Sequence, residues 1–404
     1  MEEWKEYQLK DVTTILGDGL HGTPKYDENG TVFFINGNNL VDGKIEIKDS
    51  TKRVSEYEAN KYRKNLTPRT ILVSINGTIG NVAKYKGEAC ILGKSACYFN
   101  VADNFDLNFI YYVIASQQFK DTITHLATGT TIKNVSLETM RNYSFMAPSI
   151  NEQKRISSIL SSFDDKIELN RRINDNLEQQ VQALFKLWFV DNSNPNWKET
   201  SLSEVASFVG GYSYTGEELT DCSNIAMATI KNFGRNGGFK ADGFKEINPS
   251  AKLKECHYAN LFDILVAHTD LTQNADVIGN AELLLTYGKY DSIIFSMDLV
   301  KVLPKETFPY RFLLAAMLKN KLFKGHCLGY VNGTTVLHLS KKALPDFEIR
   351  KPSDSESKMM DEVLASYYKR MAELLQENDR LISLRDTLLP KLMSGELKIN
   401  DLNC

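Results

Sequence analysis

The chain contains one sequence pattern twice, and this duplication limits the folds that it can adopt. Trp4-Lys5-Glu6 returns as Trp197-Lys198-Glu199, and Gly129-Thr130-Thr131-Ile132 returns as Gly333-Thr334-Thr335-Val336. The offset between the copies is 193 residues at the tryptophans and 204 at the Gly-Thr-Thr motif, so the second copy is longer in its interior. We therefore expect two domains of related construction in tandem.

Each copy ends in a long predicted helix with a helix-capping signal at its start. Pro148-Ser149-x-x-Glu152 and Pro352-Ser353-x-x-Glu356 both fit a capping box, in which serine and glutamate satisfy backbone N–H groups. Steps of four and three residues then give a mostly apolar line that we call the seam. In the first helix it contains Ile156, Leu160, Phe163, Ile167, Asn170, Asn174, Leu177, Val181, Leu184 and Trp188. In the second it contains Met360, Leu364, Tyr367, Met371, Leu374, Asn378, Leu381, Arg385 and Leu388.

The seams predict that the two helices pack on each other. A helix of about 40 residues is about 60 Å long, which is more than one small domain covers. Asn174 and Asn378 occupy equivalent heptad positions, and a buried polar residue in a seam typically fixes register. We expect an antiparallel coiled coil with pseudo-twofold symmetry that holds the two globular domains apart. An ordinary amphipathic helix packed on its own domain is the alternative.

The expected architecture is α+β, with two mixed α/β domains that are each followed by a long helix. The predicted divisions are 1–148, a first globular domain; 149–190, the central helix; 191–352, a second globular domain; and 353–404, the C-terminal helix and tail. Short β-rich runs are expected at Thr31–Ile35, Thr70–Ile75, Val82–Tyr85 and Ala96–Val101, and a helix at Phe105–Ser116. At 404 residues, each domain can bury its own core.

Composition favours a soluble cytoplasmic protein. The six cysteines form no CxxC pair, no export signal is evident, and no apolar run reaches the roughly 18 residues of a membrane span. The net charge of −3 comes from residues 353–404, while the remaining residues are balanced. A neutral domain can bind nucleic acid if its lysines cluster, but partners are then expected to supply part of the affinity.

The loops that differ between the copies are rich in side chains that can read base edges. Asn and Gln pair with adenine, and Arg and Lys pair with guanine. The candidate DNA-binding residues of the first domain are Lys25, Tyr26, Asn36, Asn38, Asn39, Ser74, Asn76, Thr78, Thr130, Thr131 and Lys133. Those of the second are Lys231, Asn232, Arg235, His268, Thr269, Thr272, Gln273, Asn274, Thr334 and Thr335. Gly/Asn clusters also simply form turns, and the Gly-Thr-Thr segments could contact phosphate or close a domain onto its helix.

The sequence lacks a recognisable catalytic or metal-binding pattern. The run Gly87–Ser95 separates its glycines by five residues where a phosphate-binding loop needs four. The histidines are scattered, and no Gly-x-Gly-x-x-Gly turn is present. Asn194-Pro195-Asn196-Trp197 misses the Asn-Pro-Pro-aromatic run of adenine methyltransferases. We therefore expect no catalytic residues, metal or cofactor in this chain.

Two helical motifs resemble a known family. Phe163-Asp164-Asp165-Lys166-Ile167-Glu168-Leu169-Asn170-Arg171-Arg172-Ile173-Asn174, with the run from Gln182 to Asp191, resembles the central helix of specificity subunits of type I restriction-modification systems. Leu388-Leu389-Pro390-Lys391-Leu392-Met393-Ser394-Gly395-Glu396-Leu397 resembles their C-terminal signature. The resemblance covers the whole chain, but the recognition loops vary within the family, so no base contact can be transferred.

The resemblance implies a non-catalytic subunit in which each recognition domain reads one half of a split double-stranded DNA target and the helices set the spacing. It implies docking of two modification (methyltransferase) subunits that bind S-adenosylmethionine and methylate adenine at N6. Restriction subunits would add translocation and cleavage with ATP and Mg²⁺. The candidate positions for helix packing or partner docking are Leu160, Phe163, Ile167, Asn174, Leu177, Trp188, Phe189, Leu364, Tyr367, Met371, Asn378, Leu381, Leu388 and Leu392.

Other classes remain as alternatives. A recognition subunit of a modification-only or fused restriction system would have the same sequence features. A self-sufficient nuclease or methyltransferase would need catalytic motifs. A purely structural coiled-coil adaptor would have no use for two diversified domains with polar loops.

Overall fold

The computed structural model describes residues 4–129, 132–235 and 237–398. The chain divides into two compact units, and each unit takes a piece of both long helices. Unit 1 contains Met1–Asp165 and Ile382–Cys404, and unit 2 contains Lys166–Leu381. The compact units are divided within the two long helices, whereas the predicted domain boundaries lie at the starts of these helices. The two divisions differ because each helix packs on more than the domain that precedes it.

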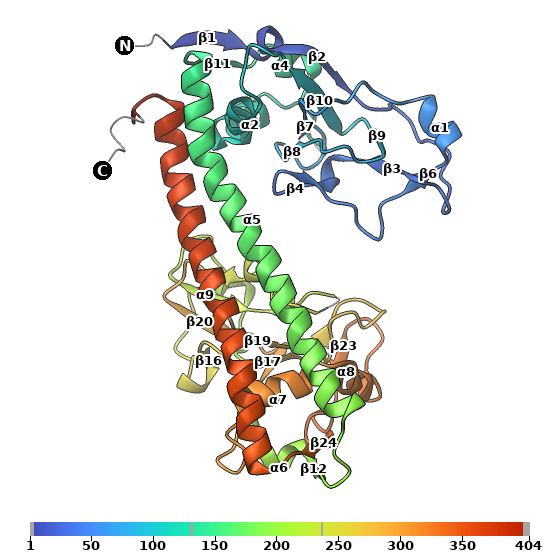
Figure 1. Ribbon diagram of the computed structural model, residues 1–404, viewed down its shortest axis with the longest axis vertical. Coiled ribbons are helices and arrows are strands. Elements are labelled where there is room, and N and C mark those ends of the chain that lie inside the picture. The colour runs from blue at the N-terminus through green and yellow to red at the C-terminus, as the bar shows by residue number, and fades with distance from the viewer. Residues whose placement is uncertain (1–3, 130–131, 236, 399–404) are drawn as a thin grey trace. The chain divides into compact units, whose positions relative to one another are not determined.

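Unit 1 is built on a four-stranded antiparallel sheet in the order β2-β10-β7-β8 (Figure 1). A smaller sheet, β6-β3-β9, contains the parallel pair β3 and β9, and β1 pairs with β11. The strands are β1 Lys5–Gln8, β2 Thr13–Asp18, β3 Val32–Ile35, β4 Leu40–Val41, β5 Lys44–Ile45, β6 Arg53–Val54, β7 Thr70–Ser74, β8 Val82–Lys84, β9 Cys90–Leu92, β10 Ala96–Val101 and β11 Ser144–Ala147. The short helices are α1 Glu56–Asn60, α2 Leu107–Ala115, α3 Gln117–His125 and α4 Leu137–Arg141.

Unit 2 repeats this topology. Its main sheet has the order β13-β21-β17-β19, its second sheet β15-β14-β20-β16 contains the parallel pair β14 and β20, and β12 pairs with β24. The strands are β12 Lys198–Ser201, β13 Ala206–Gly210, β14 Ile225–Ala228, β15 Lys245–Glu246, β16 Tyr258–Ala259, β17 Ile264–Ala267, β18 Thr269–Asp270, β19 Ala281–Leu283, β20 Ser292–Phe295, β21 Leu299–Pro304, β22 Val331–Asn332, β23 Leu337–Leu339 and β24 Glu348–Lys351. The helices are α6 Leu202–Val205, α7 Arg311–Leu318 and α8 Lys321–Leu328.

The predicted elements of the first copy are confirmed. The strand predictions match β3, β7, β8 and β10 to within one residue at each end, and the predicted helix matches α2. The reason is local: fully buried runs such as Thr70–Ser74 are rich in β-branched residues, and Asp106 caps α2 by accepting a hydrogen bond from the N–H of Phe109.

The long helices are α5 (Ile150–Lys186) and α9 (Asp354–Met393), coloured green and red in Figure 1. A π-helical turn over Leu187–Asp191 follows α5. The capping box predicted for α9 is present, because the N–H of Ser353 donates to Glu356 at 2.9 Å and the N–H of Glu356 donates to Ser353 Oγ at 3.4 Å. Both helices therefore begin where the sequence signals predict.

Within each unit, α5 and α9 run side by side and antiparallel (Figure 1). In unit 1, Ile156 and Leu160 of α5 share a core with Leu392 of α9, and Arg385 Nη1 lies 2.7 Å from Asp164 Oδ1. In unit 2, Val181 shares a core with Leu364 and Met371. Most seam predictions thus fall on positions that are buried or half-buried.

The seam also shows two features that the heptad pattern does not define. Asn170 Nδ2 donates to Asn378 Oδ1 at 2.9 Å, whereas Asn174, the equivalent of Asn378, donates its amide to the carbonyl of Met371 at 3.4 Å. Tyr368 lies off the predicted line and is nevertheless fully buried, stacked on Phe312 of α7. The heptad pattern identifies only the residues of α9 that face α5. Tyr368 is buried for another reason, because α9 also packs on other elements of unit 2, including α7.

Candidate nucleic-acid interface

In unit 1, the residues on either side of the Gly-Thr-Thr motif pair with each other as a small hairpin. The backbones of Thr128 and Asn134 are joined by hydrogen bonds of 2.9 and 2.8 Å. The hairpin is attached to the loop after β7, because Asn76 is bridged to Asn134 and its side-chain amide donates to Asn134 Oδ1 at 3.1 Å. The N–H of Gly77 also donates to the carbonyl of Lys133 at 3.2 Å. Two polar segments that are distant in the sequence are thereby joined.

Unit 2 contains the same arrangement. Asn332 pairs with His338 across the hairpin formed by β22 and β23, and Thr269 of β18 pairs with His338. Gln273, in the loop after β18, donates its side-chain amide to the carbonyl of Thr334 at 2.6 Å. The hairpin pairs are related by the offset of 204 residues, and the loop residues Asn76 and Thr269 by the offset of 193. Both units therefore contain the same composite surface. It consists of the Gly-Thr-Thr hairpin and the loop after the central strand of the main sheet, which is β7 in unit 1 and β17 in unit 2.

Glycine is needed at the first position of each hairpin turn. Gly129 and Gly333 have φ angles of +101° and +111°, which is a conformation that side-chain-bearing residues avoid. A Cβ atom would lie 2.4 Å from the carbonyl oxygen of Ile132 in unit 1 and 2.2 Å from that of Val336 in unit 2. The conserved geometry of the two turns thus explains why the motif begins with glycine.

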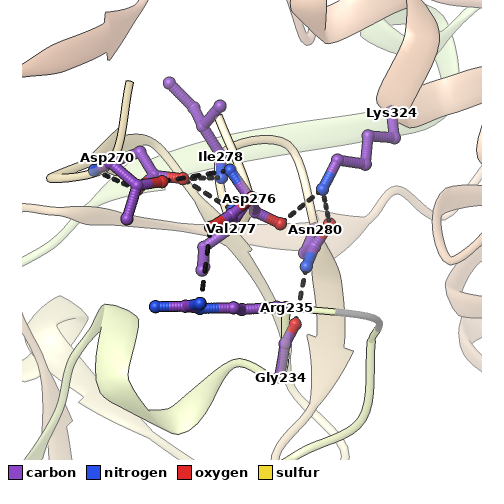
Figure 2. A network of polar contacts seen from close by, with 9 residues as sticks. Gly234, Arg235, Asp270, Asp276, Val277, Ile278, Asn280 and Lys324 are labelled. Carbon is purple, nitrogen blue, oxygen red and sulfur yellow. Dashed lines mark hydrogen bonds and ion pairs between the residues drawn. The ribbon is translucent and has the colours of Figure 1, made fainter. Parts of the chain in front are cut away.

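Asp270 holds the loop after β18 in unit 2 through hydrogen bonds to its carboxylate. One carboxylate oxygen accepts from the N–H and hydroxyl of Thr272, both at 2.8 Å, and the other accepts from the N–H groups of Val277 (2.6 Å) and Ile278 (3.1 Å). Burial opposes ionisation of this carboxyl, but these hydrogen bonds outweigh it and hold its pKa below the usual range. The loop is therefore positioned by a buried anion at its base, which Figure 2 shows.

A second set of contacts joins that loop to two neighbouring segments (Figure 2). Lys324 of α8 donates from Nζ to the carbonyl of Asp276 at 2.6 Å and to Asn280 Oδ1 at 2.8 Å. Asn280 donates from Nδ2 to the carbonyl of Gly234 at 2.9 Å, and Arg235 Nε lies 3.6 Å from Asp276 Oδ2. The segment with Arg235, the loop with Asp276 and the helix α8 thus form one connected surface.

The structure separates the predicted DNA-binding residues by exposure. Exposed are Lys25, Tyr26, Asn38, Thr78, Lys133, Lys231, Arg235, Gln273, Asn274, Thr334 and Thr335, and half-buried are Asn36, Asn76, His268 and Thr272. Thr130 and Thr131 lie outside the described residues. Burial lowers the pKa of His268, and the neighbouring His338 and Lys341 lower it further, so the neutral imidazole is favoured.

Four of the predicted contact residues are buried and make hydrogen bonds within their own unit. Asn39 and Asn232 are related by the 193-residue offset, and both are buried: their amides donate to the carbonyls of Glu46 (3.0 Å) and Lys240 (2.7 Å). Ser74 accepts from the N–H of Asn81 at 2.8 Å, and Thr269 donates to Asp298 at 2.9 Å. The hydrogen bonds of these four side chains help to shape the loops from within.

One functional candidate was missed by the sequence prediction. Lys324 belongs to the pair Phe323-Lys324, which repeats Phe119-Lys120 at the 204-residue offset. Both phenylalanines are fully buried, and Lys120 lies beside Gly80 in the loop after β7, as Lys324 lies beside the loop with Asp276. The recurrence of the Phe-Lys pair in both copies was the sequence signal that could have identified Lys324.

The predicted docking positions divide into a buried set and a half-buried set. Leu160, Ile167, Leu364, Met371, Asn378 and Leu392 are buried, and Phe163, Asn174, Leu177, Trp188, Phe189, Tyr367, Leu381 and Leu388 are half-buried. Phe189 contacts Trp197 with ring centroids 5.0 Å apart, and Trp188 is packed against the core of unit 2. The half-buried set retains apolar surface, whereas the buried set serves internal packing.

The described residues hold no group of three or more His, Cys, Asp or Glu side chains with metal-binding geometry. Among the same residues, no helix is both long and apolar enough to cross a membrane. The surfaces described above offer hydrogen-bonding and cationic groups, which are the groups that contact nucleic acid in binding interfaces.

The fold and these surfaces define a tandem recognition protein: two related units present variable polar loops on a shared pair of helices. Residues 1–179 match the family model of the type I restriction modification DNA specificity domain. The chain thus contains a match to this specificity domain and is similar along its length to specificity subunits of type I restriction enzymes.

Similarity to individual members extends over nearly the full length. The chain is 24% identical to the specificity subunit of the type I restriction enzyme HindI from Haemophilus influenzae, covering 98% of this chain and 100% of the relative. It is 21% identical to the MjaIX specificity subunit from Methanocaldococcus jannaschii, covering 99% and 95%. The crystal structure of a type I S subunit from M. genitalium shares the fold, with a TM-score of 0.54, 21% identity and coverage of 97% and 96%.

Proposed function

We propose that this chain is the DNA-recognition subunit of a type I restriction-modification complex, in which each unit reads one half of a bipartite target. The two long helices set the spacing between the half-sites and provide the attachment for modification subunits. The chain contributes no catalytic group. A modification-only system is the alternative, and it would use the same recognition chemistry.

The observation that carries this proposal is the repeated composite surface with unequal residues. Both units attach the Gly-Thr-Thr hairpin to the loop after the central strand at equivalent positions. The side chains on that frame differ, with Asn76 and Thr78 in unit 1 and Gln273 and Asn274 in unit 2. A constant support with different hydrogen-bonding groups is what two readers of different base sequences require.

The balanced charge of the chain supports the need for partners. Phosphate contacts supply much of the affinity of proteins for DNA, and this chain has a net charge of −3. We propose that two modification subunits enclose the duplex and supply S-adenosylmethionine binding and methyl transfer to adenine N6. Restriction subunits with ATP and Mg²⁺ would complete the complex.

The test is a genome-wide map of N6-methyladenine in cells that express the chain with the modification subunit encoded beside it. The proposal predicts methylation in a split motif with a fixed gap, which disappears when only this chain is removed. Absence of any difference, with both proteins soluble and associated, would contradict the proposal.

Variants of the two units provide internal controls for each other. Gln273→Ala is expected to relax or abolish recognition at one half of the motif and leave the other unchanged, because Gln273 lies in unit 2. Asn76→Ala is expected to affect the opposite half. Equal effects of both variants on both halves would contradict the assignment of one half-site to each unit.

A further inference from the structure

Unit 2 contains a hollow of about 460 Å³ that is rich in positive charge. Its lining includes Arg235, Lys319, Lys321 and Lys324, and a single carboxylate, that of Glu282. The hollow lies beside the loop with Asp276, because Arg235 and Lys324 both contact that residue. It therefore adjoins the surface assigned above to base reading.

The one carboxylate of the lining is already neutralised. Glu282 is 3% exposed in its side chain and accepts from Lys319 Nζ at 2.7 Å and from the N–H of Gly238 at 2.6 Å. Lys319 also contacts Glu178 of α5 at 3.1 Å. These two carboxylates account for the charge of Lys319. Of the other three cations, Arg235 has only its long contact with Asp276, and neither Lys321 nor Lys324 forms an ion pair with a carboxylate among the described residues.

Those three cations differ in how firmly they are held. Lys324 is directed into the network by its two bonds to uncharged oxygens, the carbonyl of Asp276 and Asn280 Oδ1. Arg235 has a side chain that is 73% exposed, and its ion pair with Asp276 is long, at 3.6 Å. Lys321 is exposed at the start of α8. Two exposed cations beside one hydrogen-bonded cation can surround an anion that arrives from solvent.

Glycine keeps the space in front of these cations open. Gly237 has a φ angle of +89°, and a Cβ atom placed there would meet only Glu282 Oε1, at 3.8 Å. Gly279, also in the lining, has a φ angle of +78°, and a Cβ atom there would lie 2.7 Å from Cys327 Cβ, so this glycine allows the close approach of α8. The wall of the hollow is thus partly bare backbone, which allows a bulky anion with tetrahedral oxygens to approach closely.

We propose that this hollow binds a phosphodiester group of the DNA backbone next to the half-site read by unit 2, with Lys321 and Arg235 as the direct contacts and Lys324 as a positioning residue. This inference rests on the proposed function. Because Arg235 and Lys324 both contact Asp276, phosphate binding also fixes the base of the loop that carries Gln273. A contact of this kind positions the unit on DNA without reading sequence.

The experiment measures the affinity of the assembled complex, this chain with its modification subunit, for a duplex with the methylated motif as a function of salt. Each phosphate contact contributes a slope of about −0.9 to the dependence of log affinity on log salt concentration. Lys321→Ala and Arg235→Ala are therefore each expected to make the slope shallower by about one. Lys321→Arg, which keeps the charge, is expected to retain the wild-type slope. Lys252→Ala is the matched control, because Lys252 is an exposed lysine of unit 2 outside the hollow.

A second readout separates phosphate contact from base reading. The methylated motif is expected to be identical in wild type, Lys321→Ala and Arg235→Ala, with weaker binding to all sequences in proportion. Wild-type slopes in both alanine variants, or a changed motif in either, would overturn the phosphate assignment. Failure of the proposed function would look different, since the wild-type complex would then show no split motif.

Discussion

Asn170 donates its side-chain amide to Asn378 Oδ1 at 2.9 Å, and the two residues are 0% and 5% exposed between α5 and α9. The pair does not join equivalent positions of the duplication, because Asn378 lies 204 residues after Asn174, and Leu374 lies 204 residues after Asn170. Asn170 also donates to Glu377 Oε2 at 2.9 Å. The helix contact of unit 2 therefore has one hydrogen-bonded asparagine pair and one asparagine, Asn174, without a matching side chain.

Replacing Asn378 by leucine is expected to reduce the free energy of unfolding by about 1–3 kcal/mol, because it leaves the buried amide of Asn170 with one partner fewer. The double variant Asn170→Leu with Asn378→Leu is expected to recover most of that loss, since both polar groups are then absent. Urea-induced unfolding, followed by the fluorescence of Trp188 and Trp197 in a Trp4→Phe background, measures the change. The control is Asn176→Leu, at an exposed position of α5, for which a change within about 0.5 kcal/mol is expected.

Replacing Asn174 by leucine is expected to have the opposite sign. Its Oδ1 atom is buried without a hydrogen-bond partner among the described residues, and its amide makes only a 3.4 Å contact with the carbonyl of Met371. Removing an unsatisfied buried polar group is expected to raise the free energy of unfolding by about 1 kcal/mol. Lower stability of Asn174→Leu in the same unfolding assay would show that the asparagine is better satisfied than its contacts indicate.

The sequence was sufficient to predict most of the fold. Strands such as β7 and β10 are short buried runs bounded by turn residues, so their local pattern determines them. The helix starts were predictable because Ser353 and Glu356 form a cap through local contacts. The pairing partner of Asn378 was not predictable, since it depends on the offset between two helices, and heptad spacing alone does not define that offset.

The candidate interface was predictable only in part. Polar loops were identified by composition, and composition cannot distinguish an exposed Gln273 from a buried Asn232 whose amide is used within its own turn. The junction between the Gly-Thr-Thr hairpin and the loop after the central strand depends on tertiary pairing of Asn76 with Asn134, 58 residues later. Lys324 was missed because its role depends on its hydrogen bonds to the carbonyl of Asp276 and to Asn280 Oδ1, which the sequence pattern does not indicate.

Lys319 is expected to be critical for the stability of unit 2. Its ammonium group lies between the carboxylates of Glu282 and Glu178, and Glu282 is 2% exposed. Lys319→Met leaves Glu282 buried without its cation, and a loss of about 3–5 kcal/mol in the free energy of unfolding is expected.

The double variant Lys319→Met with Glu282→Leu tests that reason, because it removes both buried charges and is expected to regain much of the loss. The equivalent positions of unit 1, Ala83 and Ala115, carry no charge, so an apolar contact is compatible with this fold. A double variant as unstable as Lys319→Met would contradict the explanation by an unpaired charge.

Glu218 is expected to make unit 2 sensitive to acid. The hydroxyl of Tyr212 (2.6 Å) and the N–H groups of Thr215 and Ser250 (both 2.7 Å) donate to its carboxylate and lower its pKa from 4.5 to about 2. A carboxyl with a lowered pKa in the folded state adds stability that is present above the unfolded pKa and is lost as the pH falls through the folded value. The stability difference between wild type and Glu218→Gln should therefore be largest above about pH 5 and shrink towards pH 2. A difference that is independent of pH, in unfolding experiments across this range, would exclude the ionised carboxylate as the cause.

Gly333→Ala is expected to impair recognition by unit 2 without unfolding it. The φ angle of +111° and the 2.2 Å approach of a Cβ atom to the carbonyl oxygen of Val336 force the hairpin turn to rearrange, while the turn itself is exposed. Gly216→Ala is the matched control in the same unit, because a Cβ atom there meets no atom within 4 Å and its φ angle is ordinary. In the methylation map, Gly333→Ala should weaken one half of the motif, and Gly129→Ala the other half. Unaltered methylation by Gly333→Ala, at wild-type expression and stability, would show that the Gly-Thr-Thr hairpin closes the domain and does not contact DNA.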